Sequence, residues 1–75
     1  MDTEFKLLQE IIKSIQESKP EAHLKFDVYQ NEIYIDVPGM NNITIKYNTV
    51  YIMDRHEDYY QVDAAILVEW ILMVI

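Results

Sequence analysis

Alternating apolar and polar residues between positions 23 and 53 predict β-strands. Two such runs, 23–29 and 32–37, flank Gln30-Asn31, which suits a two-residue hairpin turn. Pairing Tyr29 with Glu32 places six apolar residues on one face, namely Leu24, Phe26, Val28, Ile33, Ile35 and Val37. A shift of one residue would turn every side chain to the other face, so this pairing defines the inner face of the predicted sheet.

Two further turns, Pro38–Asn42 and a weaker one at Asn48-Thr49, predict two more strands. Across the first turn the expected pairs are Val37 with Ile43, Ile35 with Ile45 and Ile33 with Tyr47. Across the second turn they are Tyr47 with Val50 and Ile45 with Ile52. The three junctions agree on one inner face, so we expect a four-stranded antiparallel meander.

Helical spacing of apolar residues predicts one helix on each side of the strands. The first covers 3–18 and ends before Pro20. The second covers 55–74 and starts at one of two competing capping boxes, Asp54 with Glu57 or Asp58 with Gln61. The β-branched residues after position 65 leave a final strand as the alternative. The predicted fold is a single α+β domain over 1–75, a two-layer sandwich of order α-β-β-β-β-α with both helices on one face of the sheet.

The expected register also defines the outer face of the sheet. One row across the strands contains Asp27, Tyr34, Lys46 and Tyr51, and the next contains Lys25, Asp36, Thr44 and Met53. Lys46 then lies between two tyrosine rings, and Lys25 faces Asp36. Tyrosine offers a large, fairly rigid contact area with a polar tip and is enriched at interfaces. We therefore expect Asp27, Tyr34, Asp36 and Tyr51 to bind a partner, the alternative being an ordinary solvated sheet face.

The last helix carries more apolar surface than one contact with a sheet should use. Its expected core stripe is Tyr60, Ala64, Leu67, Ile71 and Val74, with further apolar residues on both shoulders. A homodimer interface at Ile66, Trp70 and Met73 would use the surplus, and would help a chain of 75 residues whose core is small. The alternatives are close packing of this helix against the first helix and association with a membrane.

The amino-acid composition of the chain excludes several classes of site and of binding partner. The chain has no cysteine and one glycine, which excludes a disulfide scaffold, a thiolate metal site and a glycine-rich phosphate loop. Thirteen acidic and six basic residues give a formal net charge of −7, which disfavours direct binding to nucleic acid or anionic lipid. The longest apolar run, 71–75, is far below the roughly 20 residues that span a bilayer, and no basic leader is visible, so a cytoplasmic protein is expected.

The densest polar cluster is Asp54-Arg55-His56-Glu57-Asp58. Carboxylates with one imidazole suit a divalent metal, but the expected role of these acids is to cap the second helix. His23 is expected on an exposed strand position, and Asp63 at the edge of the core. Since no nucleophile-base grouping is present, we expect no catalytic residue, metal or cofactor, and no enzymatic activity.

These observations predict a small acidic protein that acts by binding a protein partner, which its charge suggests is basic. The expected role is an inhibitor or anti-defence factor of phage or mobile-element type that occupies a basic nucleic-acid-binding surface. One alternative is a homodimeric structural or adaptor protein assembled through the C-terminal helix. Another is an antitoxin-like or immunity-like regulatory partner.

Overall fold

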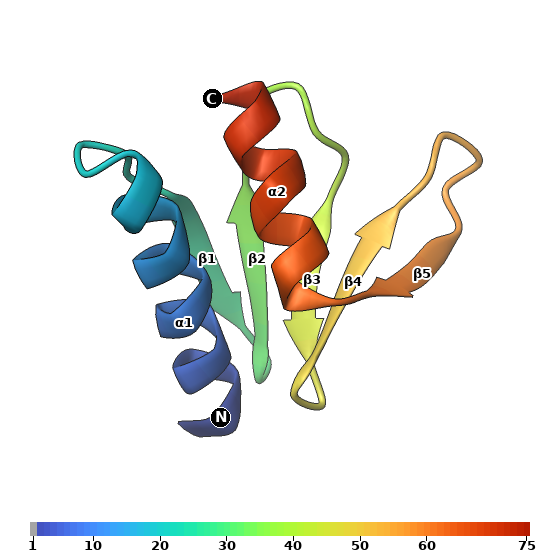
Figure 1. Cartoon of the computed structure of the whole chain (residues 1–75). Coiled ribbons are helices and arrows are strands. Elements are labelled where there is room, and N and C mark those ends of the chain that lie inside the picture. The colour runs from blue at the N-terminus through green and yellow to red at the C-terminus, as the bar shows by residue number, and fades with distance from the viewer. Residues whose placement is uncertain (1) are drawn as a thin grey trace.

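A computed structural model describes residues 2–75 and shows a five-stranded antiparallel sheet with two helices in front of one face (Figure 1). In chain order the elements are α1 (Asp2–Ser18), β1 (Lys25–Tyr29), β2 (Glu32–Asp36), β3 (Ile43–Lys46), β4 (Thr49–Met53), β5 (Tyr59–Val62) and α2 (Ala64–Val74). The strands follow one another across the sheet in the order β1-β2-β3-β4-β5. The α+β class and the meander are confirmed, whereas the prediction of four strands is wrong.

The first helix forms where the apolar spacing predicted it. Leu8, Ile11 and Ile15 recur every three or four residues and are buried, so α1 packs this stripe on β2 and β3 and against α2. The helix ends at Ser18, before Pro20, as expected. On the sheet side the core is formed by the inner-facing residues of the central strands, Ile33, Ile35, Val37, Ile43, Ile45, Val50 and Ile52.

The first hairpin has the predicted register, with Tyr29 opposite Glu32 and Phe26 opposite Ile35. The next two registers differ from the prediction by two residues. Ile33 lies opposite Ile45 instead of Tyr47, and Ile45 lies opposite Val50 instead of Ile52. Between β3 and β4 the reason is the turn, which contains Tyr47-Asn48 instead of Asn48-Thr49. Between β2 and β3 it is the longer connection, because β2 ends at Asp36 and Ile35 instead of Val37 lies opposite Ile43. A shift of two residues keeps each side chain on its face, so the predicted inner face survives.

The predicted second helix, 55–74, is wrong in its first half. Residues 59–62 form β5 at the edge of the sheet, and α2 begins only at Ala64, after Asp63 at its N-cap. Neither predicted capping box is used, and Asp63 is exposed without a side-chain capping bond. Leu67 and Ile71 are buried as expected, and the alternative of a final strand after residue 64 is excluded.

The acidic segment predicted to cap a helix instead forms the loop of the β4–β5 hairpin. Oδ1 of Asp54 accepts hydrogen bonds from the backbone N–H groups of His56, at 2.8 Å, and of Asp58, at 3.0 Å. The backbone N–H of Asp54 donates to the Asp58 carbonyl at 2.8 Å, which closes the loop. Aspartate serves both helix caps and such turns through the same acceptor chemistry, which explains the wrong prediction.

The helices cover the centre of the sheet better than its edges. Phe26 and Val28 of β1 face the helix side as predicted, yet they remain 42% and 46% exposed. Tyr60 and Val74 are both predicted in the core stripe of the last helix. Tyr60 instead lies in β5 and is 44% exposed, and Val74 is 46% exposed. Both edge strands therefore show apolar side chains to solvent. Within residues 2–75, neither helix combines the length and the apolar character needed to cross a bilayer.

Candidate functional site

Both helices lie in front of one face of the sheet, and no described helix covers the other face (Figure 1). The uncovered face is rich in tyrosine. Side chains alternate between faces along each strand, and the register places four tyrosines on this side, Tyr29, Tyr34, Tyr51 and Tyr59. We call this surface the tyrosine face. Its central row runs across all five strands through Asp27, Tyr34, Thr44, Tyr51 and Gln61.

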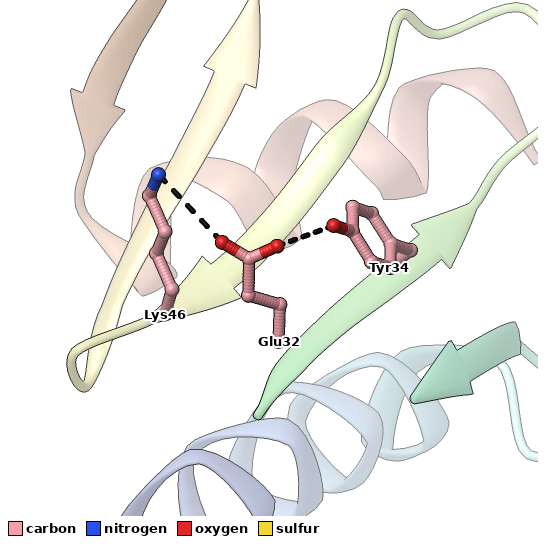
Figure 2. A network of polar contacts seen from close by, with 3 residues as sticks. All are labelled: Glu32, Tyr34 and Lys46. Atoms are coloured by element: carbon pink, nitrogen blue, oxygen red, sulfur yellow. Dashed lines mark hydrogen bonds and ion pairs between the residues drawn. The ribbon is translucent and has the colours of Figure 1, made fainter. Parts of the chain in front are cut away.

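A polar network holds two strands of the tyrosine face together. Figure 2 shows the Glu32 carboxylate between the hydroxyl of Tyr34 and the ammonium group of Lys46. The Tyr34 hydroxyl donates a hydrogen bond to Oε2 of Glu32, and Nζ of Lys46 lies 3.7 Å from Oε1 of the same carboxylate. The same Nζ lies 5.6 Å from the centre of the Tyr51 ring, within the range of a cation–π contact.

These contacts change the acidity of one phenol. The hydrogen bond to the Glu32 carboxylate, together with burial, raises the pKa of Tyr34 above its ordinary value of 10.0. The charge of Glu32 acts in the same direction, because a phenolate beside a carboxylate is repelled. The Tyr34 hydroxyl therefore keeps its proton, and with it the hydrogen bond to Glu32, to a higher pH than an ordinary phenol does.

The four residues predicted to bind a partner lie together on this face. Tyr34 lies directly opposite Asp27 of β1, and Tyr51 of β4 lies in the same row, separated from Tyr34 by Thr44. Asp36 occupies the next row, at the end of β2. Asp27 and Asp36 are exposed and the two tyrosines are half-buried, so all four can be reached from solvent.

Two details of the predicted rows are wrong. Lys46, expected between Tyr34 and Tyr51, pairs with Thr49 in a neighbouring row and reaches only the Tyr51 ring. Thr44 takes the expected place of Lys46, because the β2–β3 register differs by two residues. Lys25 does lie opposite Asp36, but the two side chains form no ion pair.

Thr44 is a residue of this face that the sequence pattern did not single out. It is only 3% exposed although no helix covers it, because it lies between Tyr34 and Tyr51 in the central row. Its hydroxyl oxygen is buried without a hydrogen-bond partner. A single threonine in a run of alternating residues carries no signal for such a position, since its burial depends on the neighbouring strands.

Glu4 is the second residue that the sequence did not mark. It is 7% exposed on the helix side, and its Oε2 accepts a hydrogen bond of 2.6 Å from the backbone N–H of Asn48. The carboxylate thereby joins the first turn of α1 to the β3–β4 turn. The contact spans 44 positions in the sequence, so no local pattern around Glu4 indicates it.

The residues predicted for self-association lie on α2, which is in front of the opposite face of the sheet (Figure 1). Ile66 is 40% exposed, Met73 is 83% exposed and Trp70 is half-buried. Together with Tyr60 they form what we call the C-terminal apolar surface. Trp70, Ile66 and Tyr60 border a hollow of about 380 Å³ between α2 and the inner side of β5.

The acidic hairpin loop has the carboxylates of a metal site but not the arrangement. One Asp54 oxygen is already used by two backbone N–H groups. Over residues 2–75, the structure brings no three histidine, aspartate or glutamate side chains close enough to hold a metal ion. His23 lies outside the strands and is exposed.

Comparisons with family profiles, with curated proteins and with solved structures give no match for this chain.

Proposed function

We propose that this protein acts without catalysis, by binding another protein through the tyrosine face. The observation that carries the proposal is the central row, in which Tyr34 and Tyr51 lie on a sheet face that no described helix covers. An all-apolar face would be expected to pack against another layer of its own chain. Tyrosine can instead remain in contact with solvent through its hydroxyl and pack against a partner through its ring.

The tyrosine face is also organised before binding. Tyr34 is held by Glu32, and Tyr51 lies beside the ammonium group of Lys46. Ordering a side chain at an interface costs about 0.5–1.5 kcal/mol, so side chains that are already held lose less on association. This supports Tyr34 and Tyr51 as the anchor residues of the surface.

The charges around the anchors favour a basic partner. Asp27 and Asp36 are exposed on the same face, and the whole chain carries a net charge of −7. Opposite charge speeds and orients association, which suits an inhibitor that occupies the basic nucleic-acid-binding surface of another protein. An antitoxin-like or immunity-like regulator would use the same chemistry on a different basic target.

The test is capture of partners from the native host lysate by three baits: the wild-type chain, Tyr34→Ala with Tyr51→Ala, and Tyr47→Asn. Tyr47 is 83% exposed in the β3–β4 turn, so its loss controls for removal of a tyrosine elsewhere. We expect one basic protein bound to the wild type and to Tyr47→Asn, released by salt and displaced by DNA or RNA. Equal capture by a folded double variant would contradict the proposal.

The second candidate function is a homodimeric structural or adaptor role. The exposure of Met73 and Ile66 at the C-terminal apolar surface favours it, since contiguous apolar patches mark interaction sites. Sedimentation of the wild type and of Met73→Asp tests it: the wild type should be dimeric and the variant monomeric. A dimer that survives Met73→Asp would remove this surface from consideration.

A further inference from the structure

β1 is an edge strand of the sheet, and its outer edge is open to solvent. Among residues 2–75, β1 pairs only with β2, so the backbone groups of alternate residues along its other edge have no described strand beside them (Figure 1). Every residue of β1, from Lys25 to Tyr29, is exposed. Such an edge can accept a further strand through its backbone hydrogen bonds.

The helix-side face of β1 is apolar and only partly covered. Phe26 and Val28 lie opposite the buried Ile35 and Ile33, yet α1 packs chiefly on β2 and β3. Phe26 therefore stays 42% exposed and Val28 46% exposed. A strand added at this edge would extend the inner face and cover both side chains.

The charged residues on the other face of β1 indicate which strand would pair with it. Lys25 and Asp27 lie on either side of Phe26 and point to the tyrosine face. If a second β1 pairs antiparallel with Phe26 opposite its own copy, Lys25 of each copy faces Asp27 of the other. The same register places Leu24 of each copy opposite Val28 of the other. A shift by one pair would instead set Asp27 against Asp27, so the charges select one register.

We propose that the chain dimerises by antiparallel pairing of β1 with β1 of a second copy around a two-fold axis, forming one continuous ten-stranded sheet. A two-fold contact uses the same patch on both copies, and β1 is complementary to itself in both charge and apolar surface. β5, the opposite edge, has no charged residue between Tyr59 and Val62 that would select a partner or a register. This pairing is an alternative to self-association through the C-terminal apolar surface, because it places the second copy at the β1 edge of the sheet.

Charge exchange with sedimentation equilibrium tests the register. The wild type is expected to be a dimer, and Asp27→Lys is expected to weaken it about tenfold or more, because each of two contacts becomes a Lys–Lys pair. The double variant Lys25→Asp with Asp27→Lys should restore dimerisation, because it exchanges the two charges. Glu10→Lys, an equal charge change at an exposed position of α1, should leave the dimer intact.

Each other outcome overturns the inference. A wild-type chain that is monomeric at every concentration removes the dimer, and with it the self-association of the second candidate function. A dimer that survives Asp27→Lys but dissociates with Met73→Asp leaves that second candidate standing and removes the β1 pairing alone. Circular dichroism of Asp27→Lys shows whether the sheet remains folded. We expect that it does, because Tyr34, the residue opposite Asp27 in β2, carries no charge that would repel the new lysine.

Discussion

The hydroxyl of Tyr34 donates a hydrogen bond to the carboxylate of Glu32, two residues earlier on the same strand and the same face of the sheet. Neighbours on one face of a strand lie two residues apart, so the contact follows directly from the alternation of β2. This hydrogen bond connects the ion pair between Glu32 and Lys46 to Tyr34 in the central row of the tyrosine face.

We predict that Tyr34 ionises at a pH above the ordinary tyrosine pKa of 10.0. The hydrogen bond to Glu32 and burial raise its pKa in the folded state, so its contribution to stability is full below the unfolded value near 10 and is lost as the pH rises through the folded value. The phenolate absorbance difference between the wild type and Tyr34→Phe measures this titration. Glu32→Gln should lower the pKa of Tyr34, and an unchanged titration would contradict the role of Glu32.

Replacing Thr44 by valine should not destabilise the protein. The Thr44 hydroxyl is buried without a partner, so its removal relieves a desolvation penalty and raises the free energy of unfolding by about 0–1 kcal/mol. Thr49→Val is the matched control, because the Thr49 hydroxyl donates to the Tyr47 carbonyl at 3.1 Å and its loss should cost up to about 1 kcal/mol. Urea unfolding compares the two, and a Thr44→Val variant less stable than Thr49→Val would refute the assignment.

Glu4→Ala should lower the free energy of unfolding by about 1–2 kcal/mol, because it removes the acceptor of the Asn48 N–H and opens a buried position. Glu10→Ala, on the exposed side of the same helix, should change it by less than about 0.5 kcal/mol. Thermal unfolding of both variants measures the difference. Equal melting temperatures would show that the contact between α1 and the β3–β4 turn contributes nothing.

Tyr47→Asn should stabilise the fold by about 0.5–1 kcal/mol. Tyr47 and Asn48 both have positive φ, at 51° and 54°, and a bulky residue is strained in this region whereas asparagine tolerates it. Little contact is lost, since Tyr47 is 83% exposed. Asn48→Ala should have the opposite sign. If chemical denaturation finds Tyr47→Asn less stable than the wild type, the strain argument is wrong.

Which residues face the core could be predicted because alternation reports the face of each side chain directly. The register between β2 and β3, and that between β3 and β4, could not be predicted in this way. Ile33 opposite Ile45 and Ile33 opposite Tyr47 both leave the same side chains facing the core. For β3 and β4 the difference lies in the turn, where Tyr47 takes a conformation that asparagine or glycine usually occupies. For β2 and β3 it lies in the connection, which already begins after Asp36. Nothing in the local pattern of Tyr47 indicates that it lies in a turn.

The missed strand β5 has another cause. Asp54 and Asp58 look like helix caps, but the Asp54 side chain binds backbone N–H groups of a hairpin loop instead. With only four residues, β5 is too short for its alternation to outweigh that signal. The tyrosines of β2 and β4 could be predicted to share a face, whereas the burial of Thr44 depends on a register that the sequence leaves open.

Hydroxyl-radical footprinting of the chain, alone and bound to the captured partner, tests the central proposal most directly. Tyrosine, tryptophan and methionine side chains all report their exposure in this measurement, and both candidate surfaces contain them. We expect protection of Tyr34 and Tyr51, with Tyr47, Trp70 and Met73 as reactive as in the free chain. Protection of Trp70 and Met73 with unchanged Tyr34 and Tyr51 would contradict binding through the tyrosine face.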